Sequence, residues 1–392
     1  MKMPKSRFHT VWMAGVAVVS TTPKLSGQEP IGVRSEVVYT IGFDESELFF
    51  GSINHLLVAP DGRVLVYDLR PGDGPAVTVL SVDGDVVAQW GTLGDGPGEL
   101  PGGPVGIAIE NDTVFVAAAQ GQLGLYTVLG QEIARSSGPP AIFLEASLSS
   151  GRMLAWRLDL HPTDTDVLFA AVFGPADGRA AWNERVLETL PVASPLKSRP
   201  LLTSIPGGRL VVGYGDEYSL GVVAAQSGDT LVKVARAVAS RTQAGTTAFL
   251  DRARQYLAHP DEAPEGWSSL VRRSDSPRGM VPHDDLLPMV NRVFWGPPGV
   301  LWVERGLGID DEYSNSLDRP DDNRMWDLFK VGDHESEYLG PTTLPEGFRP
   351  FAGNSELIAG VVRDDWNREA VRVLRVTVPH SLSTVARARD RR

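Results

Sequence analysis

The chain of 392 residues carries 37 lysines and arginines against 49 aspartates and glutamates, which gives a formal charge of −12. A charge of this sign argues against general binding to nucleic acid, which requires a basic surface. The chain also lacks cysteine, which excludes disulfides, iron–sulfur clusters, cysteine-ligated zinc and thiol catalysis.

The N-terminus has the pattern of a secretory signal. Basic residues precede a run of nine apolar residues over 11–19, and small and polar residues follow it up to Gly27. This is the order of charged, apolar and cleavable regions in a signal peptide, and the apolar run is too short to cross a bilayer as a helix. We therefore expect a signal peptide over 1–27 and a secreted or periplasmic protein without a membrane span.

Short apolar runs alternate with turn residues from 36 to 378, in units of about 40–50 residues, which is the signature of propeller blades. The first unit has runs at 56–59, 63–68, 77–81 and 86–90, and Asp83-Gly84 is a hairpin signal between the last two. The six units begin at residues 56, 105, 143, 201, 289 and 348.

Two insertions interrupt this rhythm. The first, 237–287, contains a stretch over 246–258 whose apolar spacing predicts a helix, and we expect it to pack on a rim of the propeller. The second, 306–323, is an acidic loop. The polar and basic tail, 379–392, is predicted to be disordered.

The last unit shows only three strands, and the early run 36–41 has no unit of its own. An open edge strand invites pairing with other chains, so we expect 36–41 to supply the missing outer strand. The sequence thus predicts an all-β, six-bladed β-propeller of four-stranded antiparallel blades. An N-terminal strand closes it, one helical insertion interrupts it, and the protein is expected to be a monomer.

A glycine-rich stretch after Trp90 matches a known repeat. The matching residues are Gly94, Gly96, Pro97, Gly98, Glu99 and Leu100, together with the turn Asp61-Gly62 and the strand end Val66–Asp68. The chain thereby resembles bacterial secreted six-bladed β-propellers of the NHL-repeat-like, TolB-like superfamily. The match covers about 50–135, while 140–376 shares only the rhythm. The resemblance implies a fold more than an activity, because propellers have many functions.

The glycines of 91–98 favour a crossover between blades that needs positive φ angles. A phosphate-binding loop would require a following helix and a Gly-Lys-Ser/Thr end, and the sequence has neither. The nine tryptophans fall mostly on strand runs, which predicts packing between blades. A platform for stacking sugars or peptides is the alternative.

Candidate binding residues follow from the geometry of a propeller, in which strand starts and loops of one face converge on the central channel. His55 and His283 lie where the first strands of two units begin. Arg157, Arg305 and Arg363 end the second strands of three units. If these arginines point into the channel, they form an anion-binding ring.

Two main functions remain open. One is a non-catalytic, extracytoplasmic ligand- or protein-binding propeller with its binding surface at one face of the channel. The alternative is a calcium-dependent hydrolase similar to the gluconolactonase and paraoxonase type, which the resemblance implies would hold Ca²⁺ on the axis; Asn54, Glu145 and Glu304 are its candidate ligands here. The acidic loop is a second candidate for Ca²⁺. A third alternative is a structural part of a cell-envelope assembly.

Overall fold

The computed structural model describes most of the strand-forming part of the chain. The described residues are 31–43, 48–68, 74–92, 94, 99–100, 104–110, 112–118, 122–137, 142–148, 152–159, 167–176, 179–185, 200–207, 209–214, 218–224, 230–235, 255, 259, 290–306, 324–366 and 368–378. The predicted signal peptide, tail and acidic loop (apart from Gly306) lie outside them. So does the predicted helix over 246–258 apart from Gln255, whose carbonyl accepts a hydrogen bond from the His259 N–H at 2.9 Å.

Each predicted unit forms a set of short strands, because apolar and β-branched residues alternate with turn residues. In the first half of the chain these are β1 (Arg34–Ile41), β2 (Ile53–Val58), β3 (Val64–Asp68), β4 (Val77–Leu80), β5 (Val86–Trp90), β6 (Pro104–Glu110), β7 (Thr113–Ala118), β8 (Gln122–Thr127), β9 (Glu132–Ser137), β10 (Ile142–Leu148), β11 (Arg152–Asp159), β12 (Val167–Ala176) and β13 (Arg179–Arg185). In the second half they are β14 (Pro200–Ile205), β15 (Arg209–Tyr214), β16 (Ser219–Ala224), β17 (Thr230–Ala235), β18 (Val290–Gly296), β19 (Val300–Arg305), β20 (Met325–Val331), β21 (Ser336–Thr343), β22 (Arg349–Gly353), β23 (Leu357–Arg363) and β24 (Glu369–Thr377).

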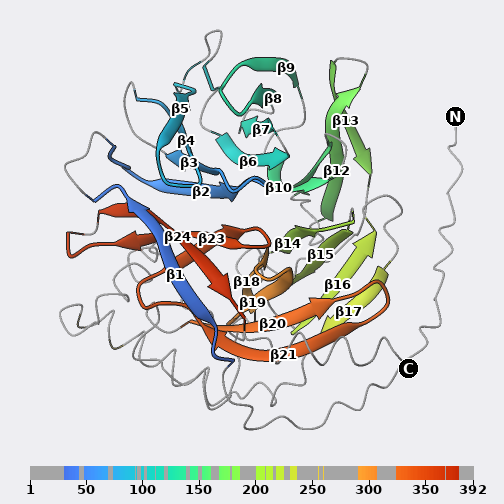
Figure 1. Ribbon diagram of the computed structural model, residues 1–392. Helices are drawn as coiled ribbons and strands as arrows, with labels where there is room; N and C mark the ends of the chain where they lie inside the picture. The colour runs from blue at the N-terminus through green and yellow to red at the C-terminus, as the bar shows by residue number, and fades with distance from the viewer. Residues whose placement is uncertain are drawn as a thin grey trace, which may run out of the picture.

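Within the described residues, these strands form six four-stranded antiparallel sheets. Five sheets take consecutive strands, β2–β5, β6–β9, β10–β13, β14–β17 and β18–β21, and the sixth has the order β1-β24-β23-β22. The first strands of successive sheets contact one another, β2 with β6 and so on to β22, which contacts β2. Figure 1 shows β6, β10, β14 and β18 toward the middle and β13, β17 and β21 at the rim. The fold is therefore an all-β propeller of four-stranded antiparallel blades.

The last sheet is completed from the N-terminus, and this pairing predicted for 36–41 is confirmed. β1 runs antiparallel to β24, from Arg34 opposite Thr377 to Ile41 opposite Val371. β1 therefore covers an edge of β24 that would otherwise be open to other chains.

The apolar core lies between neighbouring sheets. Where the fifth sheet meets the last, Trp302 and Trp326 are buried around Phe294, whose ring centroid lies 5.7 and 5.2 Å from theirs. The predicted packing of these two tryptophans between blades is confirmed. The same prediction is wrong for Trp366, which is 81% exposed in the β23–β24 turn.

The glycine-rich stretch after Trp90 joins the first sheet to the second. Gly91 has a φ of 77°, and a side chain there would collide with Leu100. The Leu100 N–H donates to the Thr92 carbonyl at 2.8 Å, and the side chain of Leu100 is fully buried in the core between the two sheets. The glycine therefore allows the chain to fold back so that Leu100 reaches that core.

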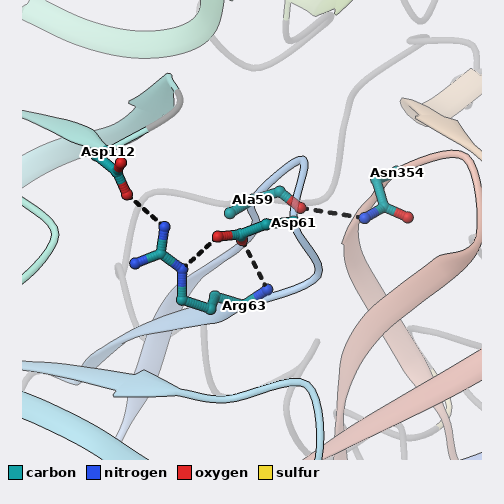
Figure 2. Close-up of polar contacts among 5 residues, drawn as sticks. All are labelled: Ala59, Asp61, Arg63, Asp112 and Asn354. Atoms are coloured by element: carbon teal, nitrogen blue, oxygen red, sulfur yellow. Dashed lines mark hydrogen bonds and ion pairs between the residues drawn. The ribbon is translucent and has the colours of Figure 1, made fainter.

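We call the side of the sheets that carries the β2–β3 turn and its equivalents the lower face. There Arg63 joins two blades: its guanidinium lies between Asp61 at 2.6 Å and Asp112, in the β6–β7 turn, at 2.5 Å (Figure 2). On the other flank, the Asn354 amide, from the β22–β23 turn, donates to the Ala59 carbonyl at 3.1 Å (Figure 2). Hydrogen bonds between turns thus link the first blade to both neighbours.

Candidate anion-binding site

The upper face is the opposite side, where the first strand of each sheet begins and the second ends. β19 ends on this face with Glu304 and Arg305, and β23 ends there with Arg363. Successive residues of a strand point to opposite sides of the sheet. Leu301 and Val303 pack toward the fourth sheet, and Val300 and Trp302 toward the last. By this alternation Arg305 points toward the fourth sheet and Glu304 toward the last.

Arg305 is buried in an ion pair. Its Nε and Nη2 donate to the two carboxylate oxygens of Asp327 in β20, at 3.0 and 2.7 Å. Tyr218 and Tyr338 donate their hydroxyls to the same carboxylate at 2.5 and 2.8 Å. Bidentate pairing of a guanidinium with a carboxylate is strong and geometrically specific. The charge of Arg305 is therefore matched within the protein, and the group joins the fourth and fifth blades.

Glu304 is buried on the other side of the same strand and contacts two arginines. Its Oε1 accepts a hydrogen bond from Arg324 Nη1 at 2.6 Å, and its Oε2 lies 3.8 Å from Arg292 Nε. Arg292 lies opposite Glu304 in the register of β18 and β19. It also donates from Nη1 to the Pro350 carbonyl of β22, which connects this group to the last blade.

Arg349 begins β22 beside these groups and is exposed. Its guanidinium carbon lies 5.0 Å from the centroid of the Phe351 ring, and that of Arg292 lies 5.4 Å from the same ring. Partial desolvation, together with repulsion from Arg292, Arg324 and Arg363, lowers the pKa of Arg349 to about 10, whereas Glu304 opposes this shift. Arg349 therefore lies close to the guanidinium groups of several other arginines.

Arg363 completes the group from β23. Its Nη2 donates to Glu369 Oε1 at 2.6 Å, while Glu369 Oε2 accepts the N–H of Ile53 from the first sheet at 2.7 Å. The side chain of Arg363 is 48% exposed. It therefore presents donor groups to solvent next to the junction of the first and last blades.

Positive charge predominates in this cluster, which we call the arginine cluster: Arg292, Arg324, Arg349 and Arg363 with Glu304 and Glu369. Among the described side chains, four guanidinium groups thus face two carboxylates. Arg349 and Arg363 are the members most accessible to solvent. Planar guanidinium groups bind carboxylates and phosphates through paired hydrogen bonds. The arrangement can therefore hold an anion from solution without any covalent chemistry.

His55 lies in β2 and stacks on Tyr67, with ring centroids 6.0 Å apart. Burial lowers the pKa of His55 from 6.5 to about 4, so the imidazole is neutral at ordinary pH. The preceding residue Asn54 is exposed at an irregularity in the β2–β3 pairing. The carboxylate of Asp68 accepts the N–H groups of Gly51 and Ser52 at 2.9 and 2.7 Å, which fixes the segment before β2.

The remaining predicted site residues are placed only by the backbone or not at all. Arg157 lies in β11 opposite Ile142, and Glu145 lies at an irregularity of β10; their side chains are outside the described part. His283 is outside it altogether. The structure therefore brings Arg363 and Glu304 into one cluster and places Arg305 in a separate buried ion pair. The predicted anion-binding ring of arginines is not tested at Arg157.

A calcium site is not favoured by this arrangement. Across the described ranges, no group of three or more histidines, aspartates and glutamates lies close enough to hold a metal ion. Calcium requires several oxygen ligands, whereas Glu304 is surrounded by guanidinium groups.

Within the described part of the chain, no helix is long and apolar enough to cross a membrane.

Sequence reasoning missed Arg292, Arg324 and Arg349. The sequence signal for Arg292 was a charged residue inside an apolar strand run, two residues after Val290. Arg324 and Arg349 lie at strand starts next to an insertion and a proline, where charged residues are common. Only the three-dimensional arrangement brings them together.

Comparisons with known proteins show no family for this chain. No family model matches the chain, and no curated protein matches it. Among solved structures, a Bacteroides fragilis protein assigned as exported matches 88% of this chain and 95% of its own, with a TM-score of 0.48 and 10% identity. The β-propeller domain of Myceliophteria thermophila Cps50 (Swd1) matches 84% and 99%, with a TM-score of 0.42 and 9% identity.

Proposed function

We propose that the chain is a non-catalytic, extracytoplasmic binding protein whose ligand carries an anionic group, held at the upper face by Arg349 and Arg363. The observation that supports this proposal is the gathering of guanidinium groups around these two exposed arginines. Like charges placed together are unfavourable for folding, and such arrangements are enriched at functional sites. The signal-like sequence over 1–27 supports the extracytoplasmic location.

In this proposal the six sheets form one closed ring of six blades. The succession of contacts between first strands, from β2 round to β22 and back to β2, supports closure. The pairing of β1 with β24 and the hydrogen bond from Ile53 to Glu369 support it at the junction of the chain's two ends. The NHL-like, TolB-like relationship remains a proposal supported by the motif at Gly94–Leu100.

Anion binding is tested by thermal unfolding in increasing inorganic phosphate, with chloride held constant. A ligand that binds only the folded state raises the melting temperature with concentration. We expect the melting temperature of the natural sequence to rise. The double variant Arg349→Ala/Arg363→Ala should weaken the apparent affinity by about a hundredfold or more, since hydrogen bonds to charged groups contribute about 1.5–3 kcal/mol each.

The matched control is Arg372→Ala/Arg375→Ala, which makes the same change in net charge farther along β24. It should leave the phosphate response unchanged. An equal response in both double variants, or none in the natural protein, would contradict the proposed site. A parallel calcium titration is expected to leave the melting temperature unchanged; a rise there would favour the hydrolase instead.

A further inference from the structure

Trp366 lies at the margin of the arginine cluster and is 81% exposed. It occupies the turn between β23 and β24, three residues after Arg363 and three before Glu369, which pair with each other. Tryptophan buries a large apolar surface when it can: Trp302 and Trp326 are buried, and Trp90 and Trp295 are half-buried. An exposed tryptophan beside exposed arginines therefore needs an explanation that a small inorganic anion does not supply.

Hydrogen bonds within the turn hold the backbone at Trp366. The Asp364 carboxylate accepts the N–H groups of Trp366 and Arg368 at 3.0 and 2.9 Å, and it pairs with Arg368 Nε at 2.6 Å. The Asp364 N–H in turn donates to the Arg368 carbonyl at 3.2 Å. Because hydrogen bonds already hold the backbone of this turn, binding would have to order only the side chain of Trp366 and not the loop that carries it.

A second exposed aromatic residue lies at the same end of the sheet. Phe50 forms a β-bridge with Glu369, and its neighbour Phe49 is 51% exposed. Glu369 also accepts the Ile53 N–H, so the segment before β2 is held against the start of β24. Exposed aromatic surface and exposed guanidinium groups therefore occur together where the first and last blades meet.

This combination is typical of protein interfaces. Tryptophan and arginine are the residue types most enriched among those that dominate binding energy, and charged patches select partners of opposite sign. The surface offers positive charge at Arg349 and Arg363, and an apolar contact at Trp366. A complementary segment would carry carboxylates on either side of an aromatic or aliphatic side chain.

We propose that the ligand of the upper face is an acidic segment of a partner protein, whose carboxylates bind Arg349 and Arg363 and whose apolar side chain packs on Trp366. This inference rests on the proposed function and adds the chemical class of the ligand. The partner is identified by its chemistry: an exposed acidic stretch with one large apolar residue within it.

The test uses the full chain and a fluorescein-labelled peptide of glutamates with one central phenylalanine, followed by fluorescence anisotropy. We expect saturable binding that Trp366→Ala weakens by about tenfold, and that Arg349→Ala/Arg363→Ala removes. The control Leu129→Ala replaces another exposed apolar side chain, in the β8–β9 turn of the second blade, and should not change binding. A peptide with lysines in place of the glutamates should not bind.

The outcomes separate this inference from the proposed function. If phosphate binding depends on Arg349 and Arg363 but Trp366→Ala leaves peptide binding unchanged, the acidic-segment proposal is overturned and anion binding stands. If a sulfated oligosaccharide binds in a Trp366-dependent manner and the peptide does not, the ligand is a polysaccharide and the proposal is again overturned. If neither phosphate nor peptide responds to the arginine variants, both proposals fail.

Discussion

Glu304 and Arg305 are neighbours in one strand, yet they lie in opposite electrostatic surroundings. Arg305 points toward the fourth sheet, where Asp327 and two tyrosine hydroxyls match its charge within the buried core. Glu304 points toward the last sheet, where guanidinium groups outnumber the described carboxylates. The charges around Arg305 are matched by one another, and these residues join two blades. The residues around Glu304 retain positive charge where they meet solvent, which is the property that an anion-binding site requires.

The largest effect is expected on the Arg305 side. Asp327→Asn keeps the shape of the side chain but removes its charge, so that the buried Arg305 loses the carboxylate with which it pairs. Breaking a buried pair in this way costs about 3–5 kcal/mol of unfolding free energy. Urea unfolding measures this loss, and Arg305→Met should produce a loss of similar size. A change below about 1 kcal/mol would mean that water reaches the pair.

On the Glu304 side, Glu304→Gln should act on stability and binding in opposite directions. The hydrogen bond to Arg324 loses its charged acceptor, which costs about 1–3 kcal/mol. The same change raises the excess positive charge, so phosphate should bind more tightly than to the natural protein. Melting temperatures with and without phosphate measure both effects. Weaker phosphate binding would show that Glu304 positions the arginines instead of opposing the anion.

The pKa of His55 predicts a smaller, pH-dependent effect away from both groups. The unfolded chain binds a proton at this residue below pH 6.5, whereas the folded protein does so only near pH 4. Between these values the unfolded state holds more protons, so stability falls as the pH is lowered through this window. Unfolding in urea at several pH values should show a shallower fall for His55→Phe. Identical pH profiles would contradict a half-buried His55 that stays neutral above pH 4 in the folded protein.

The smallest effect is expected on the lower face. Asp112 is 78% exposed and Arg63 21% exposed, so water and salt screen their interaction. Replacing Asp112 by alanine should cost about 0.2–1 kcal/mol, and less at high salt. It should leave phosphate binding unchanged, since the lower face carries no part of the proposed site. Denaturant unfolding at low and high salt measures the first effect. A larger, salt-independent loss would make this ion pair a structural link comparable to Arg305–Asp327.

The regular part of the fold was predictable because it depends on local chemistry. Apolar runs such as Val300–Val303 and turns such as Asp61-Gly62 have strong short-range preferences, and the unpaired run 36–41 indicated where the last sheet would be completed. The sequence also indicated that Arg305 and Arg363 end second strands, since strand ends follow from the same pattern. These features depend on residues close together along the chain.

By itself, then, the sequence determined the strand rhythm, the pairing of 36–41 with the last sheet and the position of Arg363 at the end of a second strand. Only the tertiary structure decided that Arg305 is neutralised by Asp327, that Arg292 and Arg324 flank Glu304, and that Trp366 remains exposed. Alternation along a strand shows that neighbouring side chains point to opposite sides, but not which blade each side meets. The contacts that distinguish a structural arginine from a binding one join residues far apart in sequence, as Ile53 and Glu369 are, and they exist only once the blades have packed.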